Sequence, residues 1–137
     1  MPNNNETILY DWIYSLEDRS EVPPCLAINI HTYCNAKCDM CTRTYEKEKL
    51  KRGLMEWNFY INIINQYKSI GGQAITYCQH GDTFAHPKAP DYIEYAITQG
   101  LKCYIVTNAS NLTPQVVDRL VSIGFKGPLV ISFHEWV

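Results

Sequence analysis

The chain has 137 residues, of which 46% are hydrophobic and 19% are charged, and its formal net charge is −2. This length suits one domain with a sizeable core, and the composition is typical of a globular protein rather than a disordered one. The small negative charge gives no support for sequence-independent binding of nucleic acid. No apolar run approaches the roughly 20 residues of a membrane helix, and no basic-then-apolar signal peptide opens the chain. We therefore expect a cytoplasmic protein that binds neither membrane nor nucleic acid.

Two segments are expected. Residues 1–24 read as a polar lead followed by a short amphipathic helix, because apolar residues at 9, 12, 13 and 16 form one helical face. The helix is expected to end at Glu21-Val22-Pro23-Pro24, since proline disrupts helical geometry. Residues 25–137 read as the core domain.

Strand and helix patterns alternate along the core domain. Strands are predicted at residues 25–30, 74–79, 102–106 and 128–133, and helices at 57–68, 91–99 and from 113 to the glycine at 124. This order predicts an α/β fold with a parallel sheet and right-handed crossovers, so the carboxyl ends of the strands share one edge. The charge-rich run 43–52 is predicted to be a solvated loop or helix end, and the alternative is that Lys47, Lys49, Lys51 and Arg52 steer substrate.

Six cysteines fall into two groups. Cys34, Cys38 and Cys41 have the spacing C-x3-C-x2-C and follow the first predicted strand. Thiolates are soft ligands for iron–sulfur clusters and zinc, and three of them leave one coordination position open. The other cysteines lie in or beside apolar runs, which indicates packed thiols in a reducing compartment; they are Cys25, Cys78 and Cys103.

Polar residues also follow the other three predicted strands. They are Gly81-Asp82, then Thr107-Asn108, then Ser132 and His134. Ligands of parallel α/β sheets gather at the carboxyl ends of the strands, so these residues and the cysteine loop predict one site.

These motifs resemble the radical S-adenosylmethionine (radical SAM) superfamily, whose signature is C-x3-C-x-Φ-C after the first strand. Met40 stands where that family usually has an aromatic residue. His80-Gly81-Asp82-Thr83 is similar to its G-G-E-P-like segment, with Asp82 in place of the longer Glu. Thr107-Asn108 and Ile131-Ser132-Phe133-His134 are similar to its motifs after the third and fourth strands. The resemblance implies a partial parallel (β/α) barrel, comprising the first four strands of a radical SAM (β/α)6 core.

The resemblance also implies cofactors and residue roles. Cys34, Cys38 and Cys41 would hold a [4Fe-4S] cluster, and SAM would occupy its open iron. The family's chemistry is reductive cleavage of SAM to a 5′-deoxyadenosyl radical that abstracts hydrogen from a substrate. The resemblance also implies contacts with SAM. Asp82 would accept a hydrogen bond from the SAM ammonium, and Gly81 and Thr83 would bring their backbone close to SAM. Ser132 and Asn108 would reach the ribose or the carboxylate, and Met40 would lie against the adenine.

Partners follow from the same resemblance. An electron donor such as flavodoxin or ferredoxin is implied, and the substrate is expected to be a peptide, a protein or a small molecule. The cysteine spacing and the Thr-Asn-Ala-Ser-Asn-Leu segment resemble SPASM-type peptide-modifying members. The core is expected to be incomplete at the C-terminus, because the family barrel has two more βα units. We expect a missing C-terminal portion or a second chain to complete it.

Three alternatives remain open from the sequence. The cysteines could bind zinc with His31 as a fourth ligand in a Cys3His site. The chain could be a non-catalytic iron–sulfur module or an inactive fragment. Asp82 could cap the turn that follows it, while His80 and His134 could contact substrate or face solvent.

Overall fold

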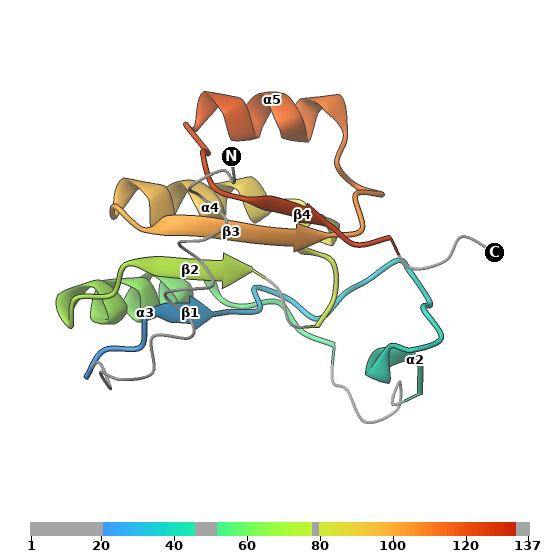
Figure 1. The fold of residues 1–137 in the computed structure, drawn as a ribbon, viewed down its shortest axis with the longest axis horizontal. Coiled ribbons are helices and arrows are strands. Elements are labelled where there is room, and N and C mark those ends of the chain that lie inside the picture. The colour runs from blue at the N-terminus through green and yellow to red at the C-terminus, as the bar shows by residue number, and fades with distance from the viewer. Residues whose placement is uncertain (1–20, 46–51, 78–79, 134–137) are drawn as a thin grey trace, which may run out of the picture.

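The computed structural model describes residues 21–45, 52–77 and 80–133. Its centre is a four-stranded sheet in which every neighbouring pair is parallel (Figure 1). The strands are β1 (Cys25–Ala27), β2 (Ala74–Tyr77), β3 (Lys102–Thr107) and β4 (Leu129–Ile131), and their order in the sheet is their order in the chain. The predicted α/β fold with parallel strands is confirmed.

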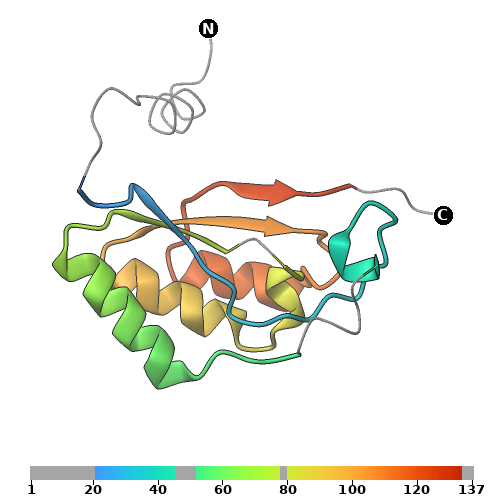
Figure 2. The ribbon, with the colours of Figure 1, turned by 90° about the horizontal axis from the view of Figure 1, so that it is seen from below.

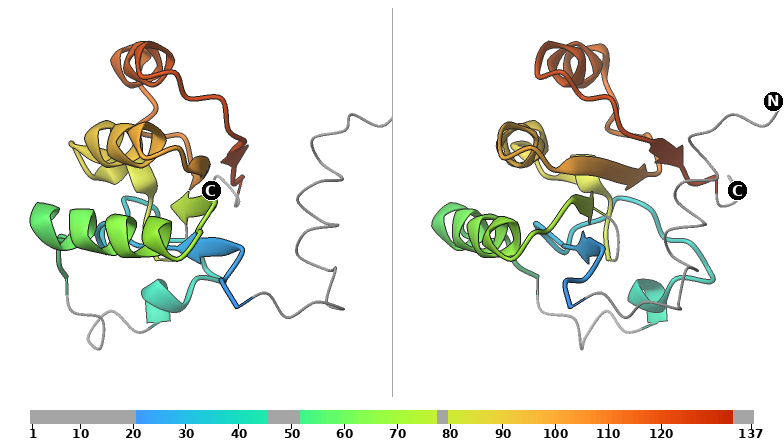
Figure 3. Two further views of the ribbon diagram at one scale, coloured as in Figure 1. Left: turned by 90° about the vertical axis from the view of Figure 1, so that its left-hand side faces the viewer. Right: turned by 60° about the vertical axis from the view of Figure 1, so that its left-hand side comes forward.

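Three helices connect these strands and cover one face of the sheet, as Figures 2 and 3 show. They are α3 (Trp57–Ser69), α4 (Ala89–Thr98) and α5 (Pro114–Ser122). When each strand pairs with its predecessor through a right-handed crossover, all the connecting helices must lie on the same face. This arrangement is a section of a (β/α) barrel, with its helices on the outside.

The core lies between the sheet and these helices. Alternate strand residues, such as Ile75, Tyr77, Cys103 and Ile105, are at most 3% exposed. They pack against the buried faces of the helices, whose members are Tyr60, Ile64, Tyr92, Ile93, Ala96 and Leu120. Cys103 is buried, as predicted for a packed thiol, and this burial raises the pKa of the thiol to about 12.

The helix boundaries agree closely with the predictions. Thr113 caps α5 by accepting a hydrogen bond from Val116 N, and Pro114 occupies the first turn. The helix α3 ends just before Gly71, whose φ of 95° is the left-handed conformation that favours glycine.

The first strand is shorter than predicted. β1 ends at Ala27 rather than at residue 30, although Ile28 N still donates to Thr76 O at 2.9 Å. Beyond it, Ile30 O accepts from Met55 N, and His31 forms an isolated antiparallel bridge with Leu54. The chain therefore leaves the sheet before the cysteine loop begins.

Several predictions concern residues outside those that the structure describes. They are the helix near residues 9–16, the strand end at Cys78, His134, and Lys47, Lys49 and Lys51 of the charged run. Within the described ranges, no helix has the length and apolar character needed to cross a membrane.

Candidate active site

The cysteine loop lies at the carboxyl edge of the sheet. Cys34, Cys38 and Cys41 are free thiols, each partly exposed. A turn between Cys38 and Cys41, in which Cys41 N donates to Cys38 O at 3.0 Å, leads into the short helix α2 (Thr42–Tyr45). Thr44 reinforces this turn, because its hydroxyl also donates to Cys38 O.

A pocket of about 460 Å³ opens between this loop and the ends of β2, β3 and β4. Eight of the nine predicted site residues line it, and they come from four separate stretches of sequence: Cys34, Cys38, Met40, Cys41, Gly81, Asp82, Asn108 and Ser132. Ala36, Arg43, Val106 and Thr107 complete the lining. The strand ends and the cysteine loop therefore line one pocket, and its role as a binding site stays a prediction.

Asp82 is the most buried polar residue of this pocket, with 2% of its surface exposed. One carboxylate oxygen accepts from Thr107 Oγ1 at 2.6 Å and from Asn108 N at 2.7 Å, and the other accepts from Phe84 N at 3.1 Å. A carboxylate has about four acceptor positions, so about one is left for a ligand. Asp82 thus caps the 3₁₀ turn η1 (Thr83–Ala85), as one alternative predicted, and also fastens β2 to β3. Its expected bond to the SAM ammonium remains a prediction for that last position.

Gly81 lines the pocket, but the structure gives a different reason for its lack of a side chain from the one the resemblance implied. Its φ is 101°, and a Cβ there would lie 2.3 Å from the carbonyl oxygen of Tyr33. That carbonyl accepts from Asp82 N at 2.9 Å and so fastens the start of the cysteine loop to the end of β2. Glycine is required here by the cysteine loop itself.

Thr83 is the predicted residue that lies apart from the cysteine pocket. It is buried, and its hydroxyl lies 2.8 Å from Tyr77 O and 3.0 Å from Val106 O, between β2 and β3. Its carbonyl faces His31 Nε2 at 3.4 Å. Its hydroxyl and carbonyl thus bind the protein itself, and the expectation that Thr83 offers backbone to SAM stays a prediction.

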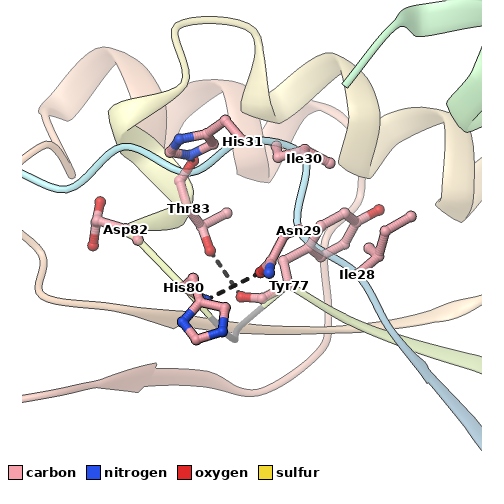
Figure 4. Close-up of a pocket in the computed structure, with 9 residues that line it drawn as sticks. Ile28, Asn29, Ile30, His31, Tyr77, His80, Asp82 and Thr83 are labelled. Atoms are coloured by element: carbon pink, nitrogen blue, oxygen red, sulfur yellow. Dashed lines mark hydrogen bonds between the residues drawn. The ribbon is translucent and has the colours of Figure 1, made fainter. Parts of the chain in front are cut away.

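His31 and Thr83 belong to a separate small cavity of about 10 Å³, roughly the space of one water molecule (Figure 4). His31 Nδ1 accepts from Tyr33 N at 2.9 Å, so the ring proton is on Nε2, which points to Thr83 O. Burial lowers the pKa of His31 from 6.5, which keeps the ring neutral. With both nitrogens engaged, His31 has no lone pair for zinc, which argues against the Cys3His alternative. His80 lies at the same cavity with an exposed side chain, and its backbone N donates to Asn29 Oδ1.

Arg43 is a site residue that the sequence analysis missed. It lies two residues after Cys41 and lines the cysteine pocket, and its buried Nη1 has no hydrogen-bond partner among the residues that the structure describes. A buried guanidinium nitrogen without an acceptor is costly, and carboxylates are the acceptors that a guanidinium binds most strongly. The sequence placed Arg43 in a charged run, where nothing separates a pocket residue from solvated neighbours.

The remaining predicted contacts differ in their availability. Met40 lines the pocket with 67% of its surface exposed, so its side chain is free to pack on a ligand. Ser132 is partly buried, and its backbone N donates to Thr107 O at 2.8 Å. The amide of Asn108 is fully engaged with Asn35, Ser110 and Cys34, so it has no donor left for a ribose or carboxylate. The contact with a ribose or carboxylate that the resemblance implied for Asn108 stays a prediction, and it would require this amide to exchange one of these partners.

The metal-binding donors of this pocket are three thiols, which are soft ligands suited to iron–sulfur clusters and to zinc. Across the described parts of the chain, no three His, Cys, Asp or Glu side chains converge closely enough to hold one metal ion. In a [4Fe-4S] cluster each thiolate binds a different iron, so the ligands stand further apart than around one zinc. Three thiols line one pocket beside the partly buried Arg43, and this donor set fits a cluster with an open iron.

No protein-family model matches the chain. Among solved structures, BtrN in complex with AdoMet (SAM) and 2-DOIA superposes with a TM-score of 0.74 at 16% identity, over 86% of this chain and 48% of BtrN. SuiB from Streptococcus suis, bound to S-adenosylmethionine, gives 0.68 at 18% identity, over 91% of this chain and 28% of SuiB.

The chain has the fold that it shares with these two solved structures, a section of a parallel (β/α) barrel. The predicted partial parallel (β/α) barrel is thereby confirmed as a fold, and this chain corresponds to about half of BtrN. A curated relative is 23% identical over 100 residues: the tungsten-containing aldehyde ferredoxin oxidoreductase cofactor-modifying protein of Pyrococcus furiosus. The match covers 72% of this chain and 28% of that protein. The chain therefore spans less than half the length of each of these proteins, namely 48% of BtrN and 28% of both SuiB and the curated relative.

Proposed function

We propose that this chain is a radical SAM enzyme, in which Cys34, Cys38 and Cys41 hold a [4Fe-4S] cluster and SAM binds at its open iron. The observation that carries the proposal is the single pocket in which all three thiols meet the polar ends of β2, β3 and β4. When bound, the cluster and SAM supply a 5′-deoxyadenosyl radical for hydrogen abstraction, a reaction that no amino-acid side chain provides.

The chain's own residues bind and orient these groups. Arg43 offers an unpaired guanidinium N–H to the carboxylate of SAM, because charge-assisted bonds of this kind are strong and directional. Asp82 offers its remaining acceptor position to the ammonium at the other side of the same amino-acid group. Ser132 follows β4 and makes a polar contact with the ribose or carboxylate of SAM. The exposed thioether of Met40 packs on the adenine.

The substrate is proposed to be a peptide or protein residue, with an electron donor such as flavodoxin or ferredoxin. Support comes from the SPASM-like cysteine spacing and from the likeness to SuiB, which has been solved bound to its precursor peptide SuiA. A small molecule is the second candidate, since BtrN was solved with 2-DOIA and has a TM-score of 0.74. A non-catalytic cluster-binding module is the competing function class, because the chain spans only part of these relatives.

The experiment is release of 5′-deoxyadenosine from SAM by the anaerobically reconstituted, reduced protein. We expect release from the wild-type chain and none from Cys38→Ala. Cys103→Ala is the matched control, because Cys103 is a buried thiol remote from the pocket lining, and its release should equal that of the wild type. Cluster-loaded protein that releases no deoxyadenosine would favour the non-catalytic module.

A further inference from the structure

The side chain of Asn108, at the end of β3, reaches across to the cysteine loop. Its Oδ1 accepts from the backbone N of Ser110 at 2.9 Å. Because a backbone N–H can only donate, this contact fixes which side of the amide is oxygen. The Nδ2 group must then face the loop, where it lies 3.0 Å from Asn35 Oδ1 and 3.8 Å from Cys34 Sγ.

Two further hydrogen bonds close a ring of three side chains. Asn35 Nδ2 donates to Ser110 Oγ at 2.6 Å, and the Ser110 hydroxyl donates to Asn108 Oδ1 at 2.5 Å. Each member of the ring donates once and accepts once, so the directions are consistent all the way round. One N–H of Asn108 is used within this ring, and the second points to Cys34.

Local backbone geometry holds the ring in place. Ala109, between two ring members, has a φ of 63°, the left-handed conformation that non-glycine residues rarely adopt. Ala109 N donates to Thr107 Oγ1 at 3.0 Å, and Asn108 N donates to Asp82 at 2.7 Å. The amide of Asn108 is therefore oriented by the backbone on both sides, and it is only partly exposed.

We propose that Asn108 is a positioning residue that donates an N–H···S hydrogen bond to the Cys34 thiolate and so raises the reduction potential of the cluster. This inference rests on the proposed function. Hydrogen bonds to ligand sulfur are among the factors that set the potentials of iron–sulfur clusters. Such a bond withdraws negative charge from the thiolate, and it therefore favours the state that carries one more electron. The electron itself comes from the external donor.

A purely structural role for the ring makes a different prediction. Ser110→Ala breaks the ring but leaves an N–H of Asn108 facing Cys34. Asn108→Ala removes that N–H as well. If the ring only holds the loop, the two variants should have the same effect on the cluster, whereas the proposed N–H···S bond is lost in Asn108→Ala alone.

The test is a redox titration of the anaerobically reconstituted full chain, followed by electron paramagnetic resonance of the reduced cluster. Iron and sulfide content is measured first in every sample. We expect full loading in all variants, a wild-type midpoint potential in Ser110→Ala, and a more negative midpoint in Asn108→Ala.

A wild-type midpoint in fully loaded Asn108→Ala would overturn the inference, as would an equal shift in Ser110→Ala. Should Asn108→Ala fail to load, Asn108→Leu keeps the side-chain shape without donors, and it should again show a more negative midpoint. Failure of both Asn108 variants to load, with Ser110→Ala loaded, would overturn the inference in favour of a role in assembly. Failure of the wild-type chain to bind iron and sulfide would instead refute the proposed function.

Discussion

Replacing Asp82 by alanine should strongly destabilise the fold, because one carboxylate joins three parts of the site edge. The substitution removes acceptors from Thr107 Oγ1, Asn108 N and Phe84 N, at 2.6, 2.7 and 3.1 Å. Hydrogen bonds to a charged group contribute about 1.5–3 kcal/mol each, and buried donors left without partners add a further cost. Water from the pocket can replace part of the loss at Asn108. We therefore expect the free energy of unfolding to fall by about 3–5 kcal/mol.

Equilibrium denaturation in urea, followed by circular dichroism, measures this loss. Asp118→Ala is the matched control, because Asp118 is exposed on α5, and it should change the free energy of unfolding by less than about 0.5 kcal/mol. Asp82→Asn keeps one carbonyl acceptor, so its loss should be intermediate. A loss below about 1 kcal/mol for Asp82→Ala would refute the view that this carboxylate fastens β2 to β3.

Three further outcomes are expected. Arg43→Gln should weaken the binding of SAM to the cluster-loaded protein by about 10-fold or more, and it should leave the binding of decarboxylated SAM unchanged. Isothermal titration measures both affinities. Equal losses of affinity for the two ligands would exclude the carboxylate contact. Gly81→Ala should cost about 2–4 kcal/mol in urea denaturation, while Gly53→Ala, where a Cβ meets nothing within 4 Å, should cost far less. Burial lowers the pKa of His31 and His86 from 6.5, so the folded chain binds fewer protons than the unfolded chain. The contribution of the two neutral rings to the free energy of unfolding is complete above pH about 6.5 and is lost as the pH falls below it. The melting temperature of the chain should therefore decline from pH 7.5 to pH 5, and it should decline less steeply in His86→Gln.

The element order and the site edge could be predicted because each rests on local sequence patterns. Alternating apolar residues marked β2 and β3, and Thr113-Pro114 marked the start of α5. Parallel strands then required all carboxyl ends to share one edge, so the cysteine loop had to face the ends of the later strands. The end of β1 was missed, because Ile30, its last predicted residue, bonds Met55 rather than the sheet, and His31 then pairs with Leu54.

The bonding within the site could not be predicted in the same way. Asp82, Thr83 and Asn108 were expected to face a ligand, but their hydrogen bonds run mostly to other parts of the protein. The partners of Asn108 lie up to 74 residues away in sequence, and no local pattern encodes such a contact. Arg43 was missed for the same reason. What distinguishes it is a buried Nη1 without a partner among the described residues, and its neighbours along the chain do not indicate this.

The iron, sulfide and zinc content of the purified, anaerobically reconstituted chain tests the central claim most directly. If Cys34, Cys38 and Cys41 hold a [4Fe-4S] cluster, the wild-type protein should contain about four iron and four sulfide per chain. Cys38→Ala should lose most of both, and Cys103→Ala should retain them. Colourless protein with about one zinc per chain and no sulfide would contradict the account.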